Sequence, residues 1–171
     1  MNRRAFTLLD NSISNGASWR SSASTNMKIV VLMSGGIDSS FAAFYLKKKG
    51  YDIIGLTFLQ LGRKDQREEL LRAKKVAKAI SIPHFVFNIE NVFEKEIIKP
   101  FLGSFSGGET PNPCSFCNKK IKFGLLWKEA KRLSAEKITA GHYARLRKEN
   151  SFYQLLKAKD ENKDQSYFLW R

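Results

Sequence analysis

The sequence has few cysteines and few histidines. Its 171 residues include two cysteines, Cys114 and Cys117, and two histidines, His84 and His142. This count excludes a small domain held together by several disulfides. Two cysteines also supply only half of the ligands of a tetrahedral zinc site or a cubane cluster, so a metal site here would need further ligands from elsewhere.

Long apolar runs and acidic residues are also scarce. No apolar run approaches the roughly 18 residues of a membrane-spanning helix, so we expect a cytoplasmic protein without a membrane segment. The 30 lysines and arginines exceed the 16 aspartates and glutamates, which leaves a formal charge of +14. Basic clusters often form solvated helix faces, but an excess of this size favours a polyanionic partner such as RNA.

The first 26 residues differ in composition from the rest of the chain. They are rich in serine, carry three arginines against one aspartate, and lack the apolar core of a secretory signal. We expect residues 1–26 to be a disordered or mis-called leader, with Met27 as the true start; organelle targeting is the alternative. Residues 27–171 are long enough for one domain with its own core.

This second part alternates between short apolar runs and longer amphipathic ones. Short stretches rich in apolar and β-branched residues predict strands over residues 29–33, 52–58, 84–89 and 137–140. Helical spacing predicts helices over residues 39–49, 65–80, 91–101 and 118–135. Such alternation is typical of an α/β fold, a doubly wound parallel sheet. Residues 143–146 and 152–156 predict a small β-hairpin appended to it.

The stretch SGGIDS, residues 34–39, joins the first predicted strand to the first predicted helix. At a helix N-terminus the backbone N–H groups are unpaired and carry partial positive charge. Gly35 and Gly36 have no Cβ to keep a ligand away from the main chain. A tight turn capped by Asp38 or Ser39 is the simpler explanation, but strand, glycines, hydroxyls and helix follow in the order of a phosphate site. The stretch has no lysine, which excludes the GxxxxGK[ST] loop.

Residues 34–39 resemble the pyrophosphate-binding loop of the N-type ATP pyrophosphatases, which bind ATP, release pyrophosphate and leave AMP on a substrate oxygen. Three later stretches are TPNPCSFCNKKIKFG (110–124), TAGHYARL (139–146) and NKDQSYFL (162–169). They are similar, in order and interval, to signatures of the bacterial tRNA-specific 2-thiouridylases. The resemblance runs from about residue 27 to the last residue.

The resemblance implies that one loop and two separate positions bind ATP. These are Leu32, Met33, Ser34, Gly35, Gly36, Ile37, Asp38 and Ser39, with Phe58 and Gly141 near the adenosine. Asp38 is implied to help hold Mg²⁺ at the phosphates, because this hard cation favours carboxylate and phosphate oxygens. Without the resemblance, Phe58 would be interpreted as a core residue and Gly141 as a turn.

The same resemblance assigns the sulfur chemistry to the CSFC stretch. Cys117 matches the catalytic nucleophile, and Asn112 and Pro113 match residues that meet the target base. Cys114 replaces the usual aspartate of the family. It is either a simple variant at the base, or it joins Cys117 as a ligand of an iron–sulfur cluster. We expect the N-terminus of the following helix to lower the thiol pKa.

Four further positions match tRNA contacts of the family: His142, Lys163, Asp164 and Gln165. As a lone histidine at a strand end, His142 could equally be structural. The implied reaction adenylates O2 of uridine 34 in tRNA and replaces this oxygen with sulfur from a persulfide donor protein. In the family, a second cysteine and further domains follow the last motif, so we expect a truncated adenylation domain. The alternative is a catalytically incomplete module that binds ATP and tRNA.

Overall fold

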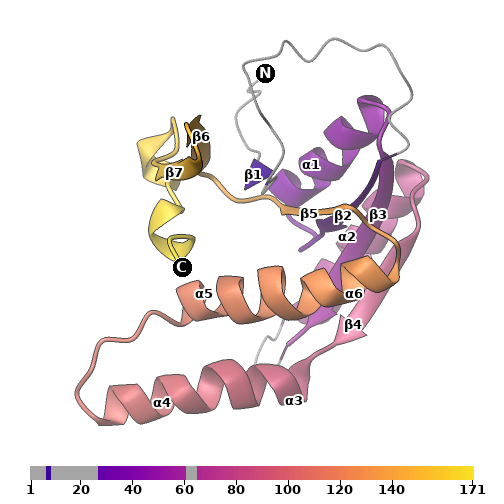
Figure 1. Cartoon of the computed structure of the whole chain (residues 1–171). Coiled ribbons are helices and arrows are strands. Elements are labelled where there is room, and N and C mark those ends of the chain that lie inside the picture. The colour runs from indigo at the N-terminus through magenta and orange to yellow at the C-terminus, as the bar shows by residue number, and fades with distance from the viewer. Residues whose placement is uncertain (1–6, 9–26, 61–64) are drawn as a thin grey trace.

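The computed structural model describes residues 7–8, 27–60 and 65–171. A five-stranded sheet lies at its centre, in the order β1-β5-β2-β3-β4 (Figure 1). The strands are β1 (Thr7–Leu8), β2 (Lys28–Leu32), β3 (Asp52–Leu59), β4 (His84–Asn88) and β5 (Lys137–Ala140). Strands β2 to β5 pair in parallel, whereas β1 runs antiparallel to β5. The predicted parallel sheet is confirmed.

The central strand β2 contributes side chains to both faces of the sheet. Val30 and Leu32 belong to one hydrophobic cluster, while Ile29 and Val31 belong to another. This alternation follows from the two-residue period of a strand. All four side chains are buried, because helices cover both faces. The fold is therefore doubly wound, as predicted.

Helices α1 (Ile37–Lys48) and α2 (Gln66–Ala79) cover the face of the sheet that carries Ile29 and Val31. They present small buried residues to it, among them Ala42 in α1. Small side chains allow the helices to pack closely on the strands. The first turn of α1 consequently lies directly beyond the end of β2.

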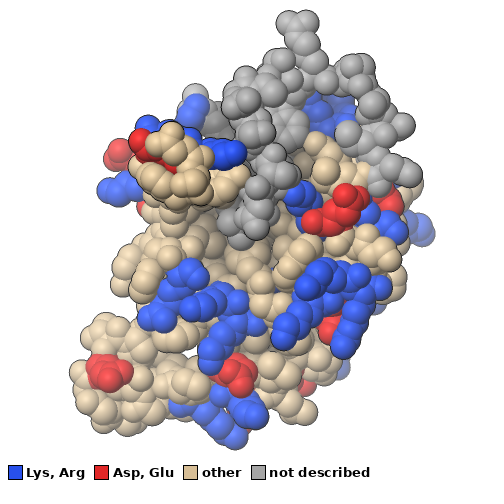
Figure 2. Space-filling view, viewed as in Figure 1, with Lys and Arg blue, Asp and Glu red and all other residues tan. Residues whose placement is uncertain are grey.

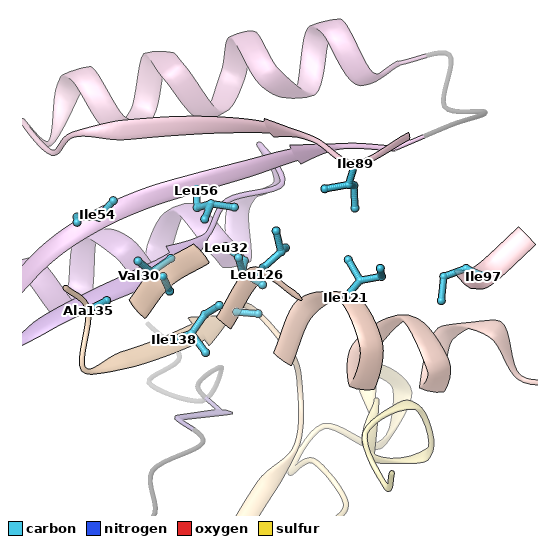
Figure 3. Packing of buried hydrophobic residues seen from close by; sticks show 12 residues of the cluster. Val30, Leu32, Ile54, Leu56, Ile89, Ile97, Ile121, Leu126, Ala135 and Ile138 are labelled. Carbon is cyan, nitrogen blue, oxygen red and sulfur yellow. The ribbon is translucent and has the colours of Figure 1, made fainter. Parts of the chain in front are cut away.

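Two helical rods cover the opposite face (Figure 1). The first consists of α3 (Glu90–Phe93), the π-helical η1 (Glu94–Ile98) and α4 (Lys99–Ser106), and the second of α5 (Pro113–Phe116), the π-helical η2 (Cys117–Leu125) and α6 (Leu126–Arg132). Ile97, Ile121 and Leu126 from these rods pack in one cluster with Val30 and Leu56 of the sheet (Figure 3). The second rod is thereby held over the carboxyl ends of the strands.

The second rod begins earlier than the sequence predicted. The helix expected over residues 118–135 begins at Pro113 and ends at Arg132. Asn112 caps it, because its Oδ1 accepts a hydrogen bond from the backbone N–H of Ser115 at 3.1 Å. Proline suits the first helical position, where no N–H is needed. The CSFC stretch therefore lies on the first turns of a helix, and not in a loop before it.

The predicted hairpin is confirmed as a separate sheet of β6 (Arg145–Glu149) and β7 (Phe152–Leu156). Its first strand begins two residues later than expected, because Gln165 binds the backbone of Tyr143. The backbone N–H of Gln165 donates to Tyr143 O at 2.8 Å, and the N–H of Tyr143 donates to Gln165 Oε1 at 2.9 Å. The C-terminal segment thus lies beside the end of β5.

Within the first 26 residues, the structure describes Thr7 and Leu8, which pair with Ala140 and Thr139 of β5. The other residues of this stretch lie outside the described part, so the disordered or mis-called leader stays a prediction. No helix in the described ranges is long and apolar enough to cross a membrane.

Candidate active site

A cavity of about 690 Å³ lies at the carboxyl ends of β2, β3 and β5, where open parallel sheets usually bind ligands. Its lining includes predicted ATP positions: Leu32, Met33, Ser34, Gly36, Asp38, Ser39, Phe58 and Gly141. It also includes Pro113, Cys114, Cys117, Asn118 and Lys122 of the second rod, with His142, Gln165 and Phe168. The fold thus brings residues from four separate motifs to one cavity.

The loop between β2 and α1 forms a compact wall. The hydroxyl of Ser39 accepts a hydrogen bond from the backbone N–H of Ser34 at 3.2 Å and donates one to Gly36 O at 3.1 Å. Gly36 is the N-cap of α1 and offers no side chain to cap the first turn. The N–H groups of this turn can therefore bind an anion in the cavity.

Two glycines are needed for packing around this loop. Gly35 has φ of +74°, and a Cβ there would clash with the carbonyl oxygen of Glu69 in α2. A Cβ on Gly141 would lie 2.8 Å from the backbone nitrogen of Ser39. Gly35 and Ile37 are not among the lining residues, so of the predicted glycine pair it is Gly36 that faces the cavity. Gly141 lets the end of β5 approach α1.

Asp38 has a partner that the sequence motifs did not identify. Its carboxylate accepts a hydrogen bond from the phenolic hydroxyl of Tyr143. This bond, together with burial, raises the pKa of Tyr143 to about 12, so the phenol keeps its proton at neutral pH. Tyr143 stands beside His142 in the TAGHYARL stretch, but nothing in the spacing indicated a contact with residue 38.

The Lys163, Asp164 and Gln165 triplet organises the C-terminal segment. Gln165 holds the backbone of Tyr143 and lines the cavity, while the ammonium of Lys163 lies 5.1 Å from the centre of the Tyr143 ring. The carboxylate of Asp164 accepts hydrogen bonds from the Ala158 N–H at 2.7 Å and the Ser166 hydroxyl at 2.8 Å. These bonds lower the pKa of Asp164. Lys163 and Asp164 do not line the cavity.

The two cysteines lie one helical turn apart in the cavity wall. Cys114 is exposed and Cys117 is partly buried. Burial raises the pKa of the Cys117 thiol, although Lys122 acts in the opposite direction. The expected lowering of the thiol pKa is therefore wrong for Cys117. The side chain lies in the second turn of the rod and is desolvated, which outweighs the nearby positive charge.

Lys122 and His142 form a second pair that the sequence did not reveal. The ammonium of Lys122 lies 3.0 Å from Nε2 of His142. His142 is 8% exposed, and burial and the Lys122 charge lower its pKa to about 3. The imidazole is consequently neutral at neutral pH and accepts a hydrogen bond from the ammonium. The sequence motifs gave Lys122 no role of its own.

Among the described residues, no group of three or more histidine, cysteine, aspartate or glutamate side chains is arranged to hold a metal ion. Cys114 and Cys117 alone do not complete an iron–sulfur site. Asp38 offers hard oxygen ligands of the kind that Mg²⁺ prefers when phosphates complete its coordination.

Curated relatives are similar to most of this chain. The tRNA-specific 2-thiouridylase MnmA of Clostridium kluyveri is 45% identical over 154 residues, covering 84% of this chain and 43% of the relative. That of Campylobacter jejuni is 43% identical over 144 residues, covering 84% of this chain and 41% of the relative. The chain therefore spans less than half the length of these relatives.

Solved structures share the fold. The U34-tRNA thiolase NcsA from Methanococcus maripaludis, solved with its [4Fe-4S] cluster, has a TM-score of 0.53 at 21% identity. The match covers 69% of this chain and 39% of the NcsA chain. A 4-thiouridine synthetase in complex with RNA and ATP has a TM-score of 0.53 at 22% identity and covers 68% of this chain and 29% of its own. At these identities the likeness establishes the α/β architecture alone.

A family model described as the tRNA methyl transferase HUP domain matches residues 27–171. The match begins at Met27, just before β2, and includes every motif that lines the cavity. The sheet, the loop and the cysteine helix thus all lie inside the matched region, and the chain belongs to the tRNA methyl transferase HUP domain family.

Proposed function

We propose that this chain is the adenylating part of a tRNA 2-thiouridylase, acting on uridine 34. The observation that carries the proposal is that residues of the loop at 34–39 and Cys117 line the same cavity. An adenylating loop and a sulfur nucleophile must reach the same base, and this arrangement allows it. The curated relatives are named tRNA-specific 2-thiouridylases.

The reaction divides one difficult substitution into two steps. O2 of the uracil attacks the α-phosphorus of ATP, and the bond to the β-phosphate breaks, so that pyrophosphate leaves. The terminal sulfur of a persulfide on a cysteine then attacks C2, and AMP leaves with the former O2. A second thiol then attacks the persulfide, leaving the sulfur on the base and a disulfide on the protein. Cys117 is one of these two thiols.

The nucleotide would bind along the loop wall. Gly36 and Ser39 at the N-terminus of α1 would hold the pyrophosphate, while Phe58 and Gly141 would adjoin the adenosine. Asp38 would help hold Mg²⁺, which supplies charge neutralisation at the phosphates. The described residues offer two thiols and no further ligand for an iron–sulfur cluster, so we assign no step to one.

The basic surface supports tRNA as the partner. Figure 2 shows lysines and arginines gathered over the second rod, while the formal charge is +14. The wobble base would have to leave its stack to reach the cavity. Pro113 and Cys114 line the cavity and would meet the base, whereas Asn112 acts as the cap of their helix. A separate protein would supply the persulfide sulfur.

The deciding experiment gives the chain tRNA, Mg²⁺-ATP and a persulfide donor. We expect pyrophosphate release that depends on tRNA, and little 2-thiouridine by mass spectrometry of digested tRNA, because we assign Cys114, the other thiol that lines the cavity, to the target base and not to sulfur transfer. Cys117→Ser should keep pyrophosphate release and lose all 2-thiouridine. A tRNA that already carries 2-thiouridine at position 34, and therefore has no O2 to adenylate, is the matched control.

Two results would overturn the proposal. Pyrophosphate release that is absent, or equal with the two tRNAs, would contradict adenylation of O2 of uridine 34, and its complete absence would reduce the chain to a module that binds ATP and tRNA. Repeated turnovers of 2-thiouridine, lost in both Cys114→Ser and Cys117→Ser, would mean that the CSFC pair is self-sufficient.

A further inference from the structure

We propose that Lys122 is a catalytic residue whose ammonium binds the α-phosphate of ATP, and that His142 is the positioning residue that aims it. This inference rests on the proposed adenylation. It gives the second rod a part in the first chemical step, in addition to the thiol of Cys117. It also assigns His142 to the nucleotide reaction and not to direct contact with tRNA.

The charges in the cavity wall support this role. Among the described residues that line the cavity, Lys122 is the only lysine or arginine, while Asp38 and Glu69 are acidic. Attack on the α-phosphorus adds negative charge to its oxygens, and a cation fixed in a site with little water stabilises such charge strongly. The loop at residues 34–39 contains no lysine. Its first-turn N–H groups can hold the pyrophosphate, which leaves the other end of the triphosphate to a cation from outside the loop.

The position of Lys122 matches this need. It lies on η2, in the rod that faces the loop across the cavity, and Cys117 begins the same π-helical segment. The charge of Lys122 acts on the Cys117 thiol, so the ammonium lies within electrostatic range of the sulfur. A cation that lines the same cavity as the loop and the thiol would meet the α-phosphate, which belongs first to ATP and then to the adenylated base.

His142 explains how the ammonium is held. Nε2 lies 3.0 Å from Nζ of Lys122, and the side chain is buried at the end of β5. Its lowered pKa of about 3 keeps the imidazole neutral, so it accepts a hydrogen bond without neutralising the lysine. A carboxylate in this place would cancel the charge, whereas a neutral acceptor directs the ammonium and leaves its positive charge intact.

The test compares Lys122→Gln with Lys119→Gln, which removes the same charge from an exposed position on the same helix. Calorimetry would measure the binding of ATP, AMP and adenosine, and a coupled assay would measure pyrophosphate release with tRNA. We expect Lys122→Gln to weaken ATP and AMP binding about tenfold and leave adenosine binding unchanged, because a charged hydrogen bond to phosphate is lost. The rate constant of pyrophosphate release should fall further, by about 100-fold or more.

His142→Phe should produce a smaller loss of the rate constant with near-normal adenosine binding, and Lys122→Arg should restore part of the rate.

The proposal is overturned if Lys122→Gln behaves as Lys119→Gln does, or if adenosine and ATP binding weaken equally. These outcomes are separate from failure of the thiolation proposal. Loss of pyrophosphate release in Lys122→Gln would stand even if no thiolated base were formed, and thiolation could proceed in a protein where Lys122 proved dispensable.

Discussion

The two walls of the cavity are built by different means. The loop wall, residues 34–39, is made mostly of backbone: N–H groups at the start of α1, with glycines that permit close packing. The opposite wall is made of side chains from η2, the end of β5 and the C-terminal segment. The contact of Lys122 with His142 holds this wall together, and the contact of Tyr143 with Asp38 joins it to the loop wall. A local sequence pattern can encode the first wall. The second exists only when distant segments meet.

The largest effect is expected where the second wall touches the first. Asp38→Asn removes the carboxylate that would hold Mg²⁺ and that accepts from Tyr143, so tRNA-dependent pyrophosphate release should fall by about 100-fold or more. Asp52→Asn, at the opposite end of the sheet, is the matched control. An unchanged release rate in Asp38→Asn would exclude Asp38 from the reaction.

A change at Gly141 tests whether the loop wall depends on backbone packing. The added Cβ of Gly141→Ala would lie 2.8 Å from the backbone nitrogen of Ser39. We expect a loss of about 1–3 kcal/mol in the free energy of unfolding, with weaker ATP binding, because α1 must shift. Gly103→Ala is the control, since nothing lies within 4 Å of its added Cβ. Chemical denaturation would measure both, and equal stability of the two variants would contradict the packing argument.

The pH dependence of stability tests the second wall. The pKa of His142 is about 3 in the folded state and lies below its ordinary value of 6.5. The unfolded chain therefore takes up a proton first as the pH falls. His142 should lower stability by up to about 1.4 kcal/mol per pH unit between about pH 6.5 and 3.

Denaturation of the native chain and His142→Gln across this pH range would isolate the effect, because the other titrating groups are common to both. The difference in unfolding free energy between them should change steadily below pH 6.5. A constant difference would mean that the histidine is not buried in its neutral form.

The smallest effect is expected from Tyr143→Phe, which breaks one hydrogen bond between the walls and keeps the ring beneath Lys163. We expect the rate of pyrophosphate release to fall by about tenfold or less. The Michaelis constant for Mg²⁺-ATP should rise, while the free energy of unfolding should stay close to that of the native chain. Tyr167→Phe, at an exposed ring, is the control. If both variants behave as the native chain does, the contact with Asp38 has no part in nucleotide binding.

The residue patterns predicted elements better than they predicted contacts. Strand β5 begins and ends where it was predicted, at residues 137 and 140, because the β-branched side chains of Ile138 and Thr139 suit a buried strand. The start of the second rod was missed, since Asn112 and Pro113 had been interpreted as base contacts and not as a cap and a first helical residue. For the same reason, the thiol of Cys117 was expected at a helix end, where its pKa would be lowered, and is instead desolvated in the second turn.

The sequence by itself determined the α/β alternation, the anion-binding order of the SGGIDS stretch and the positive charge, because these depend on neighbouring residues and on composition. The tertiary structure alone decided which charges meet. Lys122 and His142 are 20 residues apart and Asp38 and Tyr143 are 105 apart, yet each pair is joined by a hydrogen bond. Their pairing depends on how a π-helical segment lies over the strand ends and how Gln165 holds the backbone of Tyr143. Packing sets these positions, and no short-range spacing records them.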